Sequence, residues 1–233
     1  VAPVDRESGL AAFREARDGL RSTMRLRLLD SAGHPRWIEA NLRVVTGADG
    51  VVHFVGGCRD IQTEMEALAE LDRRARTDQL TGLFNRDEAL TRLRILLSSE
   101  RGGPVAVAFC DIDAFKQVND SLGHAAGDAL LVETARRIRG IVRDGDVIAR
   151  VGGDEILVVL PGVHTLEHAL LIGEKLRNCL HDPVETEAGT VRSTLSVGIT
   201  VALPGEDAED VTSRADAAMY KAKQAGRDRV MGA

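Results

Sequence analysis

The stretch Arg150-Val151-Gly152-Gly153-Asp154-Glu155-Ile156 decides the fold of the larger part of this sequence. Two consecutive glycines permit backbone angles that other residues avoid, so this stretch predicts a tight reversal of the chain. The apolar run that follows, from Ile156 to Leu160, predicts that the reversal leads into a buried strand. Asp154 and Glu155 are therefore expected at the edge of a sheet.

A second group of acidic residues follows another apolar run. Val105–Cys110 predicts a buried strand, and it ends in Asp111-Ile112-Asp113. If the two strands are neighbours, Asp111 converges with Asp154, and two carboxylates with nucleotide phosphates make a Mg²⁺ site. Glu155 then remains available to accept a proton from a sugar hydroxyl that the metal ion acidifies. The alternative is two solvated turns.

Helical and extended patterns are mixed around these two strands, which is typical of a compact α+β domain. The segment 182–189 is the one long polar break in this half of the sequence. Besides the strand from Ile156, we expect helices at 86–99, 120–142, 164–181 and 208–225 and strands at 105–111, 190–202 and around Val230.

The first quarter of the chain has a different pattern. Residues 1–18 are helical in pattern, and short extended runs follow them. Asp49-Gly50 is a strong signal for a reversal between two of these runs. We therefore expect an antiparallel meander with strands at 26–29, 37–45 and 51–55.

Residues 62–78 consist of helix formers without glycine or proline. Met65, Leu68, Leu71 and Ala75 follow a 3-3-4 spacing, which favours a dimerising signalling helix in a two-stranded coiled coil. The alternative is a single amphipathic helix lying on its own domain, because the segment holds fewer than three heptads.

Composition excludes some partners. With 36 acidic and 30 basic residues the formal net charge is −6, which argues against nucleic acid or an anionic membrane as the main partner. No apolar stretch approaches the roughly 20 residues that span a bilayer, so we expect a cytoplasmic fragment without membrane insertion. The 3 cysteines are far apart, which predicts reduced thiols.

Four motifs, in this order and spacing, resemble those of GGDEF-type diguanylate cyclases: Asp78–Arg86, Asp111–Lys116, Gly123-His124 and the Gly152–Glu155 turn. The resemblance spans about residues 76–233. It implies a nucleotidyl cyclase-like, ferredoxin-like fold with a central, mainly antiparallel sheet. It also implies that two GTP molecules are joined into cyclic di-GMP and two pyrophosphates, with Mg²⁺ or Mn²⁺, across a homodimer in which each chain supplies half of the active site.

The resemblance assigns the chemistry to five residues. Asp111, the carbonyl of Ile112 and Asp154 are implied to hold the metal ions. Lys116 is implied to stabilise phosphate charge in the transition state. Glu155 is the expected base, although Asp154 and Glu155 could share or exchange that role.

The substrate positions carry over in the same way. Asn119, His124 and Asp128 are implied to contact guanine, and a carboxylate suits guanine because it can accept from two adjacent donors that adenine lacks. Lys223 and Arg227, four residues apart on an expected helix face, are implied to reach one triphosphate. The alternatives are helix capping by Asn119 and by His124.

Arg143-Asp144-Gly145-Asp146 resembles the family's inhibitory site, where Arg143 and Asp146 would bind the product. The alternative is a salt bridge within a turn. The sequence departs from the family twice, with Ile156 in place of phenylalanine and Asp228 in place of asparagine. We expect a buried Ile156 to tolerate catalysis, although a shift of the turn by about 1 Å would cost roughly a hundredfold in rate.

Gly56–Ile61, preceded by Trp37–Glu39, resembles the carboxy-terminal half of a PAS sensor domain, with Gln62 in place of threonine. This resemblance covers residues 20–62. The chain is therefore expected to comprise a partial PAS-like sensor at 1–61, a helical signalling linker at 62–78 and a cyclase domain at 79–233.

The sequence leaves two other functions as alternatives to the cyclase. One is a catalytically silent regulatory module that binds GTP or cyclic di-GMP, against which the intact acidic turn argues. The other is a different nucleotide cyclase or hydrolase on the same fold, against which Asp128 argues.

Overall fold

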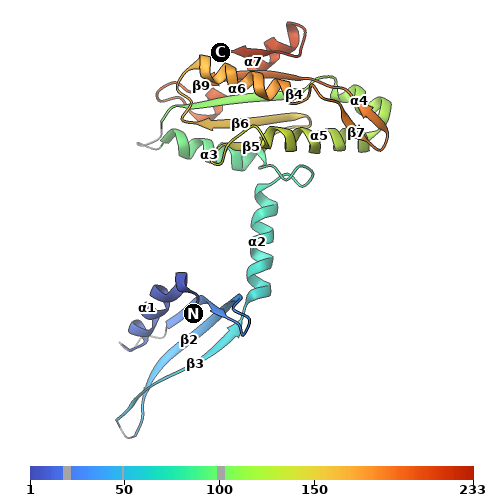
Figure 1. The fold of residues 1–233 in the computed structure, drawn as a ribbon. Coiled ribbons are helices and arrows are strands. Elements are labelled where there is room, and N and C mark those ends of the chain that lie inside the picture. Colours follow the sequence, from blue (N-terminus) through green and yellow to red (C-terminus); the bar gives the residue numbers. More distant parts are fainter. Residues whose placement is uncertain (18–21, 49, 99–102) are drawn as a thin grey trace. The chain divides into compact units, whose positions relative to one another are not determined.

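The computed structural model describes residues 1–17, 22–48, 50–98 and 103–233. The chain divides into two compact units, Val1–Arg73 and Arg74–Ala233, and each has a sheet of its own (Figure 1). Within the described residues, no helix combines the length and the apolar character that crossing a membrane requires. Cys58, Cys110 and Cys179 are free thiols, as predicted.

The first unit is a three-stranded antiparallel sheet in the order β1-β2-β3, which confirms the predicted meander. Its elements are a 3₁₀ turn Pro3–Asp5, α1 (Arg6–Arg17), β1 (Ser22–Leu29), β2 (Pro35–Thr46) and β3 (Val52–Asp60). The Asp5 carboxylate accepts hydrogen bonds from Arg27 Nε at 2.8 Å and Nη2 at 2.9 Å, which ties the first turn to β1. Asp49 of the predicted reversal lies outside the described residues.

Helix α2 (Gln62–Arg76) occupies the segment in which a helix was predicted. None of its residues is buried. Leu68 is 55% and Leu71 is 62% exposed, so the apolar stripe is accessible along the helix. The pairing of this stripe with a second helix stays a prediction.

The second unit is built on a five-stranded sheet in the order β10-β9-β4-β6-β5. Neighbouring strands are antiparallel except β9 and β10, which are parallel, so the predicted mainly antiparallel sheet is confirmed. The strands are β4 (Val105–Ile112), β5 (Val147–Arg150), β6 (Glu155–Pro161), β9 (Leu195–Val201) and β10 (Val230–Gly232).

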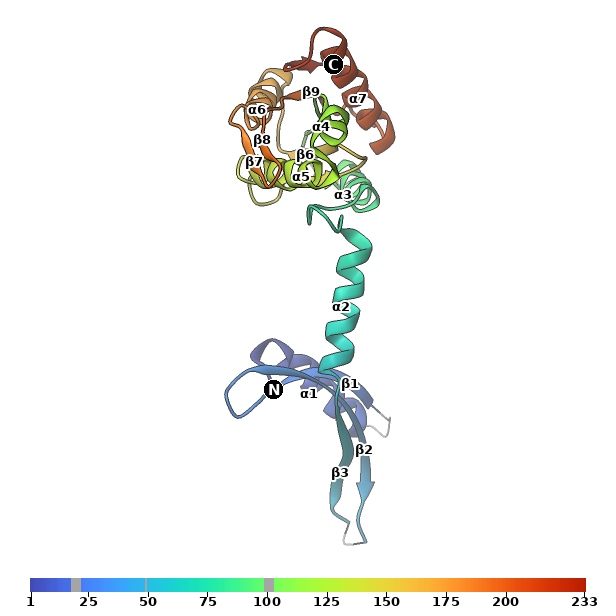
Figure 2. The same cartoon turned by 90° about the vertical axis from the view of Figure 1, so that its right-hand side faces the viewer.

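Helices cover both faces of this sheet, which is why every residue of β4 is buried (Figure 2). Ala106, Ala108 and Cys110 pack towards α5 (His124–Arg139) and α6 (Leu166–Asn178). The alternate residues of β4 pack towards α3 (Arg86–Ser98) and α7 (Ala208–Gln224). A strand buried on both faces can deliver polar side chains only at its end, where Asp111 lies.

The predicted helix at 120–142 was wrong in its extent. The structure has two helices there, α4 (Phe115–Leu122) and α5, because Gly123 takes a φ of 85° that ends the first of them. Asn119 therefore lies inside α4 and is not the amino-terminal cap of a helix. His124 is the first residue of α5.

The predicted strand at 190–202 is also divided. Its first residues form β8 (Gly189–Val191), which pairs with β7 (Val184–Thr186) inside the segment that we expected to be a loop. The hydroxyls of Ser193 and Thr194, between β8 and β9, donate hydrogen bonds to Asp113 instead of continuing a strand.

Candidate active site

The acidic residues of the two predicted strands meet in the structure. Strands β4 and β6 are antiparallel neighbours in a register that places Asp111 opposite Glu155. Just beyond this pair, the Ile112 amide donates a hydrogen bond to the Asp154 carbonyl at 3.3 Å. The expected convergence of Asp111 and Asp154 therefore follows from strand pairing.

Asp111 is only 3% exposed, and its surroundings disfavour a negative charge. Burial raises the pKa of its carboxyl to about 6, with Asp154 and Glu155 acting in the same direction and Lys223 against them. Lys223 Nζ, from the last turn of α7, lies 2.6 Å from Asp111 Oδ2. The negative charges of Asp154 and Glu155 near the buried Asp111 would favour a divalent cation beside it.

Glu155 is half-buried at the start of β6. Burial raises the pKa of this carboxyl above its usual range, and the negative charges of Asp216 and Asp154 raise it further, whereas Lys223 and Arg86 lower it. A carboxylate with a raised pKa holds a proton more tightly, which suits a general base. Sequence reasoning missed Asp216 and Arg86 because both approach from other elements.

Gly152 owes its place in the turn to the neighbouring glutamate. A Cβ atom at this position would lie 2.3 Å from Glu155 Oε2, whereas a Cβ on Gly153 would meet open space. The Glu155 side chain therefore folds back over Gly152, and a larger residue at this position would displace its carboxylate.

Arg150 connects the turn to Asp78 through hydrogen bonds. Its Nε and Nη2 atoms donate to the Gly153 carbonyl at 3.0 and 2.8 Å. Its Nη1 atom lies 3.2 Å from both carboxylate oxygens of Asp78, which is itself held by the backbone and hydroxyl of Thr81 at 2.8 and 2.7 Å. Asp78 and Arg150 each begin one of the sequence motifs, yet sequence reasoning gave neither a role. Only the fold brings position 78 to the turn.

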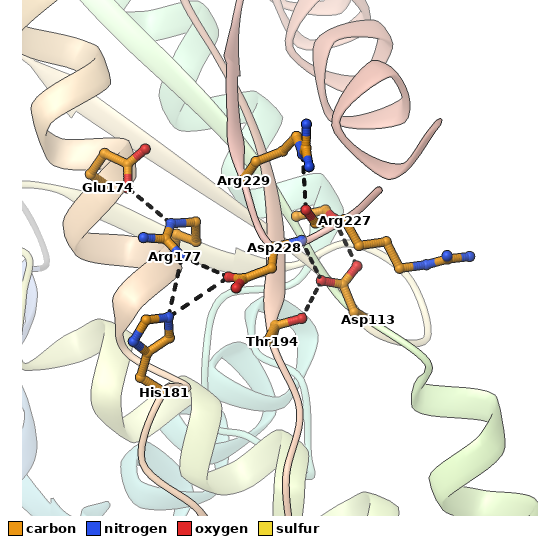
Figure 3. A network of polar contacts seen from close by, with 9 residues as sticks. Asp113, Glu174, Arg177, His181, Thr194, Arg227, Asp228 and Arg229 are labelled. Atoms are coloured by element: carbon orange, nitrogen blue, oxygen red, sulfur yellow. Dashed lines mark hydrogen bonds and ion pairs between the residues drawn. The ribbon is translucent and has the colours of Figure 1, made fainter. Parts of the chain in front are cut away.

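Asp113 organises the opposite side of the site and was also missed. It is buried, and its carboxylate accepts hydrogen bonds from Thr194 Oγ1 at 2.6 Å and the Asp228 amide at 3.1 Å (Figure 3). It also accepts a hydrogen bond from Ser196 Oγ at 2.7 Å. These three donors occupy the carboxylate oxygens of Asp113, which indicates a structural role. The Asp111 carboxylate, in contrast, contacts Lys223.

The residues expected to contact guanine lie on α4 and α5. The Asn119 side chain covers Gly127, where an added Cβ would come within 2.0 Å of its Oδ1 atom. His124 and Asp128 are exposed on the first turns of α5, and Asp128 directly follows Gly127. The structure thus brings Asn119 and Asp128 to one place. Lys116 is exposed on the first turn of α4, directly after the β4 edge.

The expected placement of Lys223 and Arg227 on one helix face was wrong. Helix α7 ends at Gln224, and Arg227 lies beyond it with a φ of 61°. The preceding Gly226, with a φ of 110°, cannot continue the helix. Lys223 therefore reaches Asp111 from the helix, and the exposed Arg227 extends from a separate turn.

Arg143 and Asp146 are paired with each other. The Arg143 amide donates to Asp146 Oδ2 at 3.0 Å, its Nε atom lies 3.3 Å from Oδ1, and its Nη2 atom donates to the Pro161 carbonyl. This is the salt bridge of the alternative interpretation. Both residues also line a cavity of about 290 Å³, together with Arg139 and residues 82–84, so the pair faces a space that a ligand could enter.

Ile156 is fully buried, opposite Cys110 of β4 and Arg150 of β5. Its side chain belongs to the core on the side of α5 and α6. An aliphatic residue is accommodated there without leaving a buried polar group unpaired.

Within the described ranges, no group of three or more histidine, cysteine or acidic side chains could by itself hold a metal ion. The available donors are the carboxylates of Asp111 and Asp154 and a backbone carbonyl. Mg²⁺ is commonly held by one or two carboxylates together with substrate phosphates, so this donor set fits such an ion.

Comparisons with known proteins identify the family of this chain. An uncharacterized protein of Mycobacterium tuberculosis is 35% identical over 199 residues, which cover 85% of this chain and 31% of that protein. The diguanylate cyclase DgcP of Pseudomonas aeruginosa is 40% identical over 166 residues, 70% of this chain and 25% of DgcP. The chain thus spans about a third or less of these relatives.

Among solved structures, the coiled coil and GGDEF domain of DgcB from Caulobacter crescentus, in complex with cyclic di-GMP, superposes with a TM-score of 0.69 at 30% identity. The match covers 74% of this chain and 93% of the DgcB chain. Residues 75–229 match the family described as diguanylate cyclase, GGDEF domain. The chain therefore belongs to the GGDEF family of diguanylate cyclases.

Proposed function

We propose that this chain condenses two GTP molecules into cyclic di-GMP and two pyrophosphates. The observation that carries the proposal is the meeting of Asp111 with Asp154 and Glu155 on adjacent strands, beside the Lys223 ammonium. Such a cluster suits phosphoryl transfer, in which catalysis rests on positioning and on the stabilisation of phosphate charge.

In this proposal each chain binds one GTP and two chains face each other. Glu155 accepts the proton of the 3′-hydroxyl of its GTP as that oxygen forms a bond to the α-phosphorus of the partner's GTP. The bond between that phosphorus and the pyrophosphate oxygen breaks, and pyrophosphate leaves. The same step in the opposite direction closes the ring.

Asp111, the Ile112 carbonyl and Asp154 would hold Mg²⁺ or Mn²⁺. When bound, the metal ion supplies positive charge for the phosphates and acidifies the hydroxyl that it contacts. The burial of Asp111 supports this assignment, because a carboxyl with a pKa raised to about 6 gains from a nearby cation.

The substrate is recognised at its two ends. We assign the guanine base to Asn119, His124 and Asp128 and the phosphates to Lys116, Lys223 and Arg227. The proximity of Asn119 to Gly127, next to Asp128, supports the first group. The contact of Lys223 with Asp111 supports the second, because it places an ammonium where phosphates would approach the metal ligands.

Dimerisation through α2 would control how the two half-sites face each other. The exposed Leu68 and Leu71 support pairing of two such helices, and the DgcB structure likewise comprises a coiled coil and a GGDEF domain. The PAS-like first unit would supply the signal. Product binding at Arg143 and Asp146 would restrain turnover, and the adjoining cavity supports this.

The activity is tested by incubating the purified chain with GTP and Mg²⁺ and identifying the products by mass spectrometry. We expect cyclic di-GMP with GTP, no cyclic product with ATP, and loss of product with Glu155→Gln. Glu187→Gln, an exposed glutamate in the β7–β8 turn, serves as the matched control and should act as wild type. Binding of GTP without turnover at high protein concentration would favour the silent regulatory module instead.

Product inhibition is tested separately by adding cyclic di-GMP to the wild type and to Arg143→Ala. We expect the wild type to be inhibited and the variant to resist. Equal inhibition of the two proteins would remove the regulatory assignment of Arg143 while leaving the cyclase proposal intact.

A further inference from the structure

The turn between α7 and β10 has an unusual backbone. Three consecutive residues have positive φ angles: Gly226 at 110°, Arg227 at 61° and Asp228 at 43°. Glycine adopts such angles freely, but arginine and aspartate do so at a cost in free energy. Two adjacent non-glycine residues with positive φ persist only where surrounding contacts hold the backbone in this conformation. The contacts of this turn therefore show what stabilises it.

One set of contacts attaches the Asp228 side chain to α6. Arg177 Nη1 donates to Asp228 Oδ1 at 2.8 Å, and the arginine side chain is only 18% exposed (Figure 3). Its Nε atom binds Glu174 of the same helix at 2.9 Å. His181 Nε2 lies 3.2 Å from Arg177 Nη1 and 3.9 Å from Asp228 Oδ1. The Asp228 carboxylate is therefore bound to a charged group that is itself fixed.

A second contact attaches the Asp228 backbone to the catalytic strand. Its amide donates to Asp113 Oδ2 at 3.1 Å, and Asp113 is held in turn by Thr194 and Ser196. Asp113 follows Asp111 by two residues at the end of β4. The backbone that carries Arg227 is thus tied directly to the strand that presents the metal-ligand candidate.

Within the part of the chain that the structure describes, Arg227 makes its hydrogen bonds through its backbone. Its carbonyl accepts a hydrogen bond from Arg229 Nε at 3.0 Å, and its amide donates to the Ala222 carbonyl at 3.0 Å. Its side chain is exposed and extends away from the network in Figure 3. The direction in which this guanidinium points therefore depends on the backbone angles that the Asp228 contacts enforce.

We propose that Arg177 and Asp228 are positioning residues, which hold the strained turn so that Arg227 is aimed at the phosphates of GTP. This inference rests on the proposed function, because it takes the phosphate role of Arg227 from there. The ion pair between Arg177 and Asp228 fixes the side chain of the turn. The hydrogen bond from the Asp228 amide to Asp113 fixes the position of the turn relative to Asp111.

The test compares Arg177→Gln with the wild type. Glutamine removes the guanidinium and leaves the residues of the turn unchanged, so the change isolates the ion pair with Asp228. We expect the KM for GTP to rise about tenfold, the factor that corresponds to about 1.4 kcal/mol, while kcat changes much less. In calorimetric titrations without turnover, affinity for GTP should fall, whereas affinity for GMP should fall less. A wild-type KM would overturn the proposal.

A double variant separates positioning from general stability. If Arg177 and Asp228 act through Arg227, adding Arg177→Gln to Arg227→Ala should raise the KM no further. Multiplying effects would overturn the proposal. Asp228→Asn keeps an oxygen that can accept from Arg177, so it should raise the KM less than Arg177→Gln. If Arg177→Gln does not fold, Arg177→Lys replaces it, and a wild-type KM in that variant would overturn the proposal. Glu167→Gln, an exposed glutamate in the first turn of the same helix, is the matched control and should keep the wild-type KM.

The two proposals fail in different ways. If the wild type makes no cyclic di-GMP, the proposed function is wrong, and the GTP and GMP titrations still test the positioning of Arg227. If the wild type is active and Arg177→Gln binds and turns over GTP as the wild type does, only the positioning inference is wrong.

Discussion

Arg150→Gln tests whether the position of the acidic turn depends on the hydrogen bonds that Arg150 makes to Gly153 and Asp78. In the structure the Arg150 guanidinium donates to the Gly153 carbonyl and to both oxygens of Asp78. The side chains of Arg150 and Asp78 are 18% and 23% exposed, so water replaces these contacts poorly. Glutamine removes the charge and the forked set of donors together.

The expected loss of stability in Arg150→Gln follows from the groups that lose their hydrogen-bond partner. Hydrogen bonds to charged groups contribute about 1.5–3 kcal/mol, and a partly buried group without its partner costs about 1–3 kcal/mol. Asp78 keeps its two hydrogen bonds from Thr81, and both side chains retain some contact with water. We therefore expect the free energy of unfolding of the second unit to fall by about 2–3 kcal/mol. A displacement of the turn by about 1 Å would lower kcat roughly a hundredfold.

The assays are urea unfolding of the second unit and the rate of cyclic di-GMP formation. Arg136→Gln is the control, because Arg136 pairs with Glu133 on one helix and is 70% exposed, and such pairs contribute about 0.3–0.5 kcal/mol. If Arg150→Gln unfolds at the wild-type urea concentration and keeps the wild-type kcat, the claim that the Arg150 hydrogen bonds hold the turn is refuted.

Three further results are expected. Gly152→Ala should lower kcat about a hundredfold by displacing the glutamate carboxylate of the turn, whereas Gly153→Ala, with open space around its Cβ, should not; equal effects would contradict this. Ile156→Ala should destabilise the second unit by about 2–5 kcal/mol and Ile156→Val by about 0.5–1.5 kcal/mol in urea unfolding, and a smaller loss for alanine would mean that the core collapses around the site. The hydrogen bonds from the side chain and the backbone amide of Arg27 lower the pKa of Asp5 to about 2, so an NMR titration should find that value in the wild type. Arg27→Gln keeps the backbone hydrogen bond, so the pKa of Asp5 should be higher than in the wild type but still below the ordinary value. Since the folded pKa lies below the unfolded one, this contact stabilises the first unit above about pH 4 and its contribution is lost as the pH falls towards 2.

The centre of the fold could be predicted from sequence because it depends on local patterns. The apolar runs before Asp111 and after Glu155 are unbroken, and β5 pairs with β6 across the short turn between them. Neither Gly152 nor Gly153 has a positive φ, so the expectation that the turn needs backbone angles reserved for glycine was wrong. Strand pairing then brings the carboxylates together, as the motif spacing indicated. Local signals were weaker at Gly123, where a single left-handed residue divides a helical pattern in two.

The supporting residues could not be predicted, because their partners are distant in the sequence. Asp78 meets Arg150 and Asp113 meets Asp228 only once the sheet has formed. Arg227 was misplaced for a related reason, since a lysine and an arginine four residues apart suggest one helix face while Gly226 ends the helix between them. Spacing predicts the residues of the reaction, and tertiary contacts determine how they are held.

The central claim is that Asp111 and Glu155, opposite each other on β4 and β6, belong to one catalytic unit. The most direct test measures the rate of cyclic di-GMP formation for Asp111→Asn, Glu155→Gln and the double variant, each with Mg²⁺ in excess. Residues that act as a unit are strongly non-additive, so the double variant should be about as slow as the slower single one. Full activity in Asp111→Asn, or losses that multiply in the double variant, would contradict the account.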